Sequence, residues 1–182
     1  HPFIKETLSE IADTGCKKII AICMTPQRSN YSANGYEKDV SDGLDALKVN
    51  PDLRFVPEWH MNRRFHEAVA EKITEAMQAF KKNGQKTAVI FSAHSLPLKA
   101  MNNDDPYVHQ IDETIKGVLS LAGELDWKLG YQSKGLAPGE WLKPSVDSIL
   151  ENLPSEGYKN VLIVPIIFVS DHVETLYDID IL

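Results

Sequence analysis

The stretch that decides the fold is Thr87-Ala-Val-Ile-Phe-Ser-Ala-His-Ser-Leu-Pro97. Its apolar run, Ala88 to Phe91, is typical of a short strand that is buried on both faces. Polarity changes abruptly at Ser92, and Pro97 prevents a regular continuation of the strand. We therefore expect His94 just past the carboxyl end of a buried strand. In open parallel sheets, ligands bind at that end of the strands.

A second stretch of the same kind lies near the end of the sequence, Asp171-His-Val-Glu-Thr-Leu-Tyr-Asp178. It also follows an apolar run, which predicts a buried strand over residues 160–166. Throughout the sequence, such apolar runs alternate with segments of helical periodicity. This alternation predicts an α/β fold of the doubly wound type, in which parallel sheets are covered by helices on both faces.

The periodicity also predicts where the elements lie. Helices are expected over 2–13, 36–47, 62–82, 106–125 and 141–153, and a further helix is expected to begin at Asp171. Pro144 is expected in the first turn of the helix over 141–153. Strands are expected over 18–24, 53–57, 88–91, 127–131 and 160–166. Asn83-Gly84 is the best internal boundary, so we expect two domains, 1–84 and 85–182. The first domain is expected to carry two strands and the second three, which is few for an independent sheet. The sequence also opens on His1 instead of Met, and we expect it to be a piece of a longer protein.

Composition excludes several classes of protein. The chain has 182 residues, 43% of them hydrophobic, which is enough for one ordinary domain or two small half-domains. The net charge of −7 argues against nucleic acid as a partner. Cys16 and Cys23 lie in or beside an apolar run, so we expect buried, reduced thiols, and without a Cys-x-x-Cys pair we expect neither an iron–sulfur cluster nor a zinc ribbon. The longest apolar run, Val161 to Val169, is too short to span a bilayer, and no signal peptide is visible.

His94 is the first candidate for chemistry. An imidazole at the end of a strand can accept a proton or bind a metal ion, and Ser92 and Ser95 flank it with hydroxyl groups. A histidine that merely caps the loop through hydrogen bonds explains the same pattern. From the residues alone, both interpretations stay open.

Glu174 and Asp178 are the second candidates. If a helix opens at Asp171, the two carboxylates project from one face, one turn apart. Such a pair can hold a divalent cation or relay protons. The alternative is a solvated acidic face, in which Asp171 and Glu174 partly serve to cap the helix. His172 is either a further ligand or a surface residue.

Other side chains are expected near the same end of the sheets. The polar segment from Pro26 to Tyr36 follows the first strand, although an ordinary loop explains it too. Trp141 and Trp59 are candidates for an aromatic pocket or for the core. From the residues alone, the sequence predicts an α/β protein with a histidine and paired acids at strand ends, handling a metal ion or protons.

At these residues the sequence resembles the ferrochelatase family, whose members insert ferrous iron into a porphyrin. The resemblance rests on motifs that occur in the family's order along the whole chain. They are Pro26-Gln-x-Ser-x-x-Ser-x-x-x-Tyr36, Ser92-Ala-His-Ser-Leu-Pro97, Tyr131-Gln-Ser133 followed by Pro138-x-x-Trp-Leu-x-Pro144, and Phe168-Val-Ser-Asp-His-Val-Glu-Thr-Leu-Tyr-Asp178. Each motif alone is weak, but their combination is specific.

The resemblance implies two Rossmann-like domains of the chelatase type, the first of them incomplete here, with a porphyrin cleft between them. It implies that His94 accepts pyrrole protons or ligates the metal, and that Glu174 shares this work from the other side of the macrocycle. Asp178 would continue an acidic path for the hydrated metal ion. The porphyrin itself would contact Tyr36, Ser92 and Trp141.

For partners, the resemblance implies a porphyrin and ferrous iron as substrates, no permanently bound cofactor and no iron–sulfur cluster in this chain. It implies a cytoplasmic, bacterial-type enzyme, and it leaves peripheral membrane association and oligomeric state open. The family's porphyrin-covering lip and its C-terminal segment fall outside this sequence, so the chain alone is expected to chelate weakly or not at all. The alternatives are a non-catalytic porphyrin- or haem-binding module, a cobalt or nickel chelatase of similar architecture, and a purely structural domain.

Overall fold

The computed structural model of the chain describes residues 2–31, 33–81, 84–101, 104–136, 138–171, 173–178 and 181, without the side chains of Lys81, Glu174 and Asp178. The elements follow in the order α1 (Ile4–Asp13), β1 (Lys18–Ile22), α2 (Ala33–Leu47), β2 (Asp52–Val56), α3 (Arg63–Lys81), β3 (Thr87–His94), the short 3-10 helix η1 (Leu98–Ala100), α4 (Tyr107–Ala122), β4 (Trp127–Gln132), α5 (Val146–Asn152), β5 (Asn160–Pro165) and α6 (Val173–Asp178). Strands and helices therefore alternate along the described chain, as the periodicity predicts.

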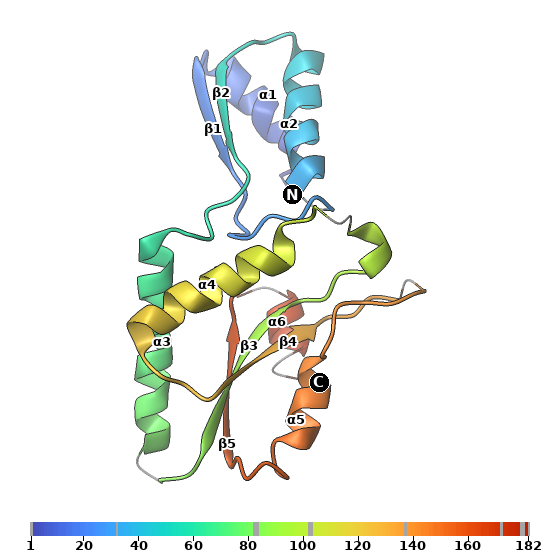
Figure 1. Ribbon diagram of the computed structural model, residues 1–182. Helices are drawn as coiled ribbons and strands as arrows, with labels where there is room; N and C mark the ends of the chain where they lie inside the picture. Colours follow the sequence, from blue (N-terminus) through green and yellow to red (C-terminus); the bar gives the residue numbers. More distant parts are fainter. Residues whose placement is uncertain are drawn as a thin grey trace.

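The strands form two sheets, which Figure 1 shows in separate parts of the molecule. β1 pairs with β2 in the smaller sheet, and β3 lies between β4 and β5 in the larger one. All three pairings are parallel, as expected where a helix connects one strand to the next. The predicted α/β fold with parallel sheets flanked by helices is confirmed. Two complete domains are not evident in the described residues.

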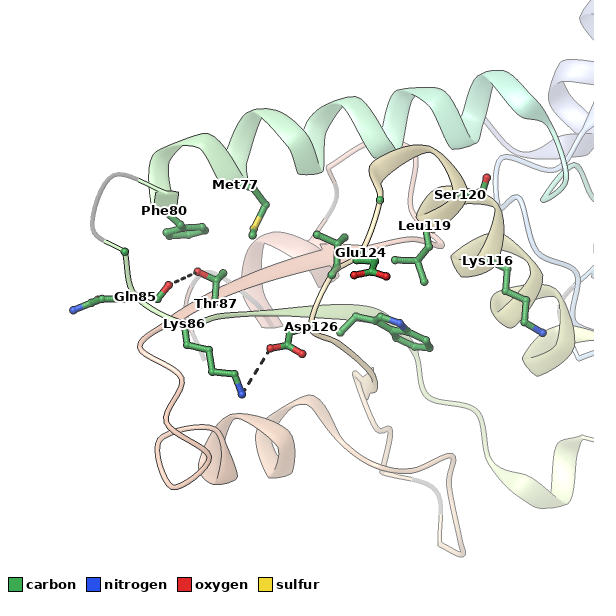
Figure 2. Close-up of a pocket in the computed structure, with 14 residues that line it drawn as sticks. Met77, Phe80, Gln85, Lys86, Thr87, Lys116, Leu119, Ser120, Glu124 and Asp126 are labelled. Atoms are coloured by element: carbon green, nitrogen blue, oxygen red, sulfur yellow. Dashed lines mark hydrogen bonds and ion pairs between the residues drawn. The ribbon is translucent and has the colours of Figure 1, made fainter.

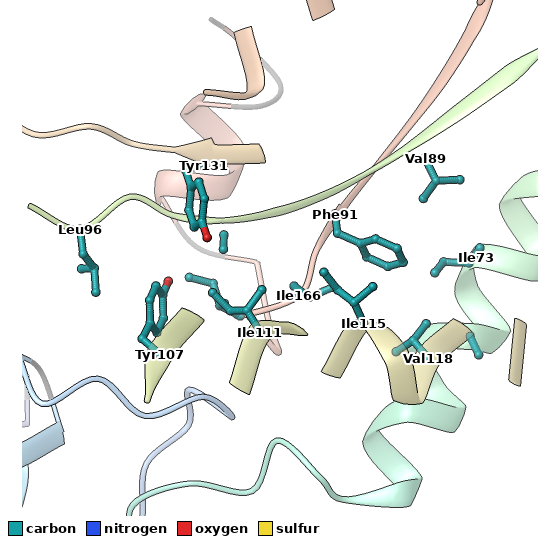
Figure 3. Close-up of a cluster of buried hydrophobic side chains, with 13 residues drawn as sticks. Ile73, Val89, Phe91, Leu96, Tyr107, Ile111, Ile115, Val118, Tyr131 and Ile166 are labelled. Atoms are coloured by element: carbon teal, nitrogen blue, oxygen red, sulfur yellow. The ribbon is translucent and has the colours of Figure 1, made fainter. Parts of the chain in front are cut away.

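Strand β3 is the centre of the larger part because it is buried on both faces. Val89 and Phe91 belong to a core with Ile111 and Ile115 of α4, which Figure 3 shows in close-up. The alternate residues of β3 pack on the opposite face, against a cluster that α5 provides. Since successive side chains of a strand point to opposite faces, this double cover requires the continuous apolar run from Ala88 to Phe91.

The smaller sheet is covered on one face only in the described chain. Leu8 of α1 and Val40 and Leu44 of α2 form a buried cluster, against which apolar residues of β1 and β2 pack. Ile20 and Ile22 of β1 are exposed. The strand therefore presents an apolar surface on the side away from that cluster.

Helix α3 packs with the larger sheet, although it precedes the predicted domain boundary at residue 84. Ala70 and Ile73 of α3 are buried in the same core as Phe91 of β3. The division into 1–84 and 85–182 stays a prediction. The packing of α3 groups this helix with the residues that follow the predicted boundary.

A polar network joins the smaller sheet to α4. The loop after β1 contributes Gln27, whose side-chain N–H donates to Thr114 Oγ1 at 2.9 Å, and Arg28, whose backbone N–H donates to Gln110 Oε1 at 2.6 Å. Ser29 donates its hydroxyl to Asp105 Oδ2 at 3.0 Å, just before α4. Because Gln27 and Ser29 are buried, these bonds replace hydrogen bonds to water and fix the loop against the helix.

The helix predicted over 141–153 begins later than expected. Trp141 instead forms an antiparallel bridge with Pro97. Ser145 provides the N-cap of α5, because its hydroxyl accepts a backbone N–H of the first turn at 3.1 Å. Pro144 therefore precedes the cap and does not lie in the first turn.

Two predictions from composition concern the cysteines and the membrane. Cys16 is exposed and Cys23 is partly buried, and both are free thiols. The prediction of a buried thiol is wrong for Cys16, because this residue lies in the short connection between α1 and β1 and not in the strand. Among the described helices, none combines the length and the apolar character needed to cross a bilayer.

We predict that Ile115→Ala, in the core of the larger part, lowers the free energy of unfolding by about 2–5 kcal/mol, because it leaves a cavity in a closely packed site. Ile115 is 1% exposed, whereas Leu121 on the same helix is 45% exposed. Leu121→Ala is therefore the matched control and should change the stability by less than about 1 kcal/mol. Urea unfolding followed by circular dichroism measures both. Equal losses for the two variants would contradict this account of the core.

Candidate functional site

His94 is the last residue of β3, whereas the sequence analysis places it just past the end of the strand. The residue is partly buried. Ser92 lies two residues before it and is fully buried. Because side chains alternate along a strand, Ser92 and His94 point to the face of β3 that α5 covers. Phe91 and Ala93 point to the opposite face. The strand thus carries the imidazole to the carboxyl end of the sheet on a rigid, buried backbone.

The backbone around His94 is fixed by neighbouring elements. The Tyr107 hydroxyl of α4 donates to the His94 carbonyl oxygen at 2.9 Å. The next residue, Ser95, donates its backbone N–H to the Gln132 carbonyl oxygen of β4 at 2.7 Å. Because contacts from two different elements meet at this one point, the peptide that carries the imidazole has little freedom to move.

Trp141 is held beside the loop that follows His94. The Leu98 N–H donates to the Glu140 carbonyl oxygen at 2.8 Å, and the Leu142 N–H donates to the Leu96 carbonyl oxygen at 3.0 Å. These two hydrogen bonds flank the antiparallel bridge between Pro97 and Trp141. Trp141 is 8% exposed. The structure therefore brings together three of the predicted site residues, at the carboxyl end of the larger sheet. They are Ser92, His94 and Trp141.

Gln132 is a further polar residue of this region, and the sequence analysis assigns it no role. It ends β4 at the level of His94, with which it pairs in register. The residue is 8% exposed, and among the described residues neither its amide oxygen nor its amide nitrogen has a hydrogen-bond partner. The buried hydroxyl of Ser92 likewise has none there. Leaving a buried polar group without a partner costs about 1–3 kcal/mol.

The acidic candidates follow β5. Glu174 and Asp178 lie in α6, four residues apart, as the sequence predicts, but the positions of their side chains lie outside the described part of the chain. His172 lies outside the described residues altogether. Since β3, β4 and β5 are parallel, α6 starts from the same end of the sheet as His94. Within the described residues, no three His, Cys, Asp or Glu side chains are placed to hold a metal ion.

Tyr36 lies apart from the residues around His94. It is half exposed in the first turns of α2 and lines a pocket of about 480 Å³ together with residues of α1 and β1. Trp59 donates its indole N–H to the Cys23 carbonyl oxygen at 2.7 Å and lines a pocket with residues that follow β5, among them Phe168 and Asp171. The predicted pocket that joins Trp59 and Trp141 stays a prediction.

A larger pocket, of about 1150 Å³, lies at the opposite end of the sheet (Figure 2). It is bounded by the residues that open β3 and β4, among them Thr87 and Trp127. The ammonium group of Lys86 lies 3.7 Å from Asp126 Oδ2 and also 3.7 Å from the centre of the Tyr158 ring, so this cation already has partners. Ligands of parallel sheets bind at the carboxyl ends of strands, and the candidate site is accordingly the region around His94.

Comparison with known proteins gives a consistent result. A family model described as ferrochelatase matches residues 1–182. The chain is 36% identical over 182 residues to a ferrochelatase of Herpetosiphon aurantiacus, covering 100% of this chain and 60% of that protein. It is 37% identical over 183 residues to a ferrochelatase of Deinococcus radiodurans, covering 99% of this chain and 58% of that protein.

A third relative carries a more specific name. The coproporphyrin III ferrochelatase of Oceanobacillus iheyensis is 36% identical over 182 residues, covering 99% of this chain and 58% of that protein. The chain thus spans less than two thirds of the length of the curated relatives that it matches.

We predict that Gly135→Ala displaces the Trp141 ring. A Cβ at Gly135 would lie 2.9 Å from the indole Cη2, and a rigid ring can relieve this contact only by moving. The expected cost is about 1–3 kcal/mol, with a changed near-ultraviolet circular dichroism spectrum. Gly35→Ala is the control, because open space surrounds that glycine and alanine favours the helix in which it lies. Unchanged stability and spectrum in Gly135→Ala would refute the contact.

A second prediction concerns Tyr131, which is 4% exposed among the side chains of Figure 3. Burial raises the pKa of its phenol above the ordinary value of 10.0. Above that pH the unfolded chain loses this proton while the folded protein keeps it, so stability falls as pH rises. Tyr131→Phe should therefore flatten the fall in Tm between about pH 9 and about pH 11. Tyr31→Phe, at an exposed tyrosine, is the control and should follow the wild type; identical profiles for all three proteins would count against the assignment.

Proposed function

Because the chain belongs to the ferrochelatase family, we propose that the full-length protein inserts ferrous iron into a porphyrin, a step of haem biosynthesis. In this reaction the macrocycle loses two pyrrole protons while a divalent cation loses its bound water. Such a step needs a proton acceptor and an anionic relay close together. Ferrous iron is a substrate here and not a resident cofactor.

We assign the proton acceptor or metal ligand to His94. The observation that carries this assignment is its position at the carboxyl end of the central strand, where Tyr107 and the Ser95–Gln132 hydrogen bond fix its backbone. Metal insertion gains from a ligand that is already oriented, because no conformational freedom is lost in the reaction.

We assign the anionic relay to Glu174 and Asp178. Their spacing of one helical turn in α6 favours one face for both carboxylates. In this proposal Glu174 meets the macrocycle on the side opposite to His94, and Asp178 supplies the hydrated metal ion. Two carboxylates in series lower the cost of bringing a divalent cation out of water, because each exchanges bound water for an anionic oxygen.

We assign contacts with the porphyrin to Trp141, Ser92 and Tyr36. A flat, aromatic macrocycle favours stacking on an indole or phenol ring, and Trp141 is already held in place beside the loop after His94. Tyr36 belongs to the other part of the structure, which the polar network on α4 ties to the larger sheet. Binding energy from both parts can distort the ring and expose its nitrogens. On its own, the 182-residue chain is expected to insert metal weakly.

The test is insertion of ferrous iron into a porphyrin by the full-length protein, followed by absorbance. His94→Ala should lower kcat by about 100-fold or more, because it removes a proton acceptor at the reacting centre. His109→Ala is the matched control, since this exposed histidine on α4 lies 3.5 Å from Glu113 and plays no part in the proposed site. It should retain the wild-type rate.

Two results would contradict the proposal. Full activity of His94→Ala would remove the central role of this imidazole. Tight porphyrin binding by the wild type without any metal insertion would favour a non-catalytic binding module instead.

A further inference from the structure

The side chain of Gln132 is the least explained polar group of the candidate site. It is more than nine-tenths buried, yet within the described part of the chain both its amide oxygen and its amide nitrogen lack a hydrogen-bond partner. A buried amide normally finds partners, because water is no longer there to supply them. Both functional groups of this side chain are therefore available to a ligand as far as the described residues go.

A second buried glutamine shows what a structural role looks like in the same protein. Gln27 is 2% exposed, and its amide nitrogen donates to Thr114 Oγ1 at 2.9 Å and to the Ile166 carbonyl oxygen at 3.3 Å. Its bonds join the smaller sheet to α4. The amide oxygen of Gln27 has no partner among the described residues, as in Gln132, so the two side chains differ in the amide nitrogen, which is bonded in Gln27 and not in Gln132.

The position of Gln132 relates it to His94. The two residues pair in register at the ends of β4 and β3, so their side chains leave the sheet on the same face. Ser92, two residues before His94, shares that face and also has an unsatisfied hydroxyl. On this face α5 packs closely against β4 one pleat earlier, since a Cβ at Gly130 would lie 3.0 Å from Val146 Cγ2. Ser92 is in register with Gly130 and so lies at the level that α5 covers, whereas the Gln132 amide and the His94 imidazole lie one pleat further, at the carboxyl end of the sheet.

The chemistry of these groups favours a hydrated cation over an anion. A carboxylate taken into a buried site needs a cationic partner, and the residues on either side of Gln132, Tyr131 and Ser133, bring none. An amide oxygen, in contrast, accepts hydrogen bonds from metal-bound water and is itself an oxygen ligand for divalent cations. An imidazole beside it is a common ligand for transition metals.

We propose that Gln132 binds the incoming hydrated divalent metal ion beside His94. The amide oxygen accepts a hydrogen bond from a water molecule of the ion, and the amide nitrogen donates to a second oxygen of the hydration shell. This inference rests on the proposed function, because it names a further residue for the metal substrate of the same site. Gln132 contacts the ion before the ion reaches the macrocycle.

The experiment uses Gln132→Met in the full-length protein, since methionine keeps the length of the side chain and removes the amide. Co²⁺ is the probe, added without porphyrin and followed by its visible absorption. The variant should bind Co²⁺ about tenfold more weakly, and its KM for ferrous iron should rise by a similar factor. Porphyrin affinity, measured by fluorescence quenching, should stay within about twofold, because the amide faces the metal ion and not the macrocycle.

Thermal stability separates this role from a structural one. Gln132→Met should keep or raise the Tm, because it removes an unsatisfied buried amide. Gln27→Met is the matched control: it breaks two hydrogen bonds to the larger part, so its Tm should fall, while its affinity for Co²⁺ stays near that of the wild type. A conservative Gln132→Glu variant keeps an oxygen ligand and should bind Co²⁺ at least as well as the wild type.

Several outcomes would overturn the inference. The first is that the wild type binds no Co²⁺, or that Gln132→Met binds it as tightly as the wild type. The second is that Gln132→Met weakens porphyrin affinity and leaves the KM for ferrous iron unchanged. The third is that the Tm of Gln132→Met falls as far as the Tm of Gln27→Met. Failure of the proposed function looks different. In that case the wild type inserts no metal, yet Gln132→Met still weakens Co²⁺ binding.

Discussion

The pairing of β3 with a parallel strand on each side is the constraint on which the rest of the structure depends. β4 and β5 hold it in register from Thr87 to His94, and apolar clusters cover both of its faces. A slip of one residue would exchange the two faces and bury His94 against α4. That slip would force the large Phe91 ring into the space that Ile90 fills beside α5 and would bury the Ser92 hydroxyl among the apolar side chains of α4, and both changes are unfavourable. The core therefore fixes not only the strand but also the direction in which the candidate imidazole points.

The second constraint is polar and joins the two parts of the molecule. The loop after β1 meets α4 through buried hydrogen bonds of Gln27 and Ser29. Each bond is modest, but breaking one leaves a buried group unsatisfied, so the loop has one preferred position on the helix. In a protein proposed to bind a macrocycle between two parts, such a joint gives the parts a defined relation. Helix α4 therefore both receives the loop after β1 and fixes the backbone of His94, because the Tyr107 hydroxyl donates to the His94 carbonyl oxygen.

Much of this arrangement follows from the sequence, and the exceptions have physical reasons. The apolar run from Ala88 to Phe91 predicts a buried strand, but its place between β4 and β5 follows only from the fold. The helix predicted to open at Trp141 fails because residues far away in sequence, around Pro97, pair with this segment. The placement of α3 with the larger sheet likewise depends on long-range packing, which periodicity does not report. At the site, His94 stands out by its position after an apolar run. Gln132 also follows a predicted strand and lies in a quoted motif, but its lack of partners among the described residues is visible only in the folded protein.

The central claim is that an imidazole and a carboxylate distant in sequence face each other across a flat tetrapyrrole. The most direct measurement is a crystal structure of the full-length protein with a bound porphyrin. We expect the macrocycle to lie between the His94 ring and the Glu174 carboxylate, with its nitrogens toward both. A porphyrin bound elsewhere, or a Glu174 side chain directed away from the ring that His94 contacts, would contradict this account.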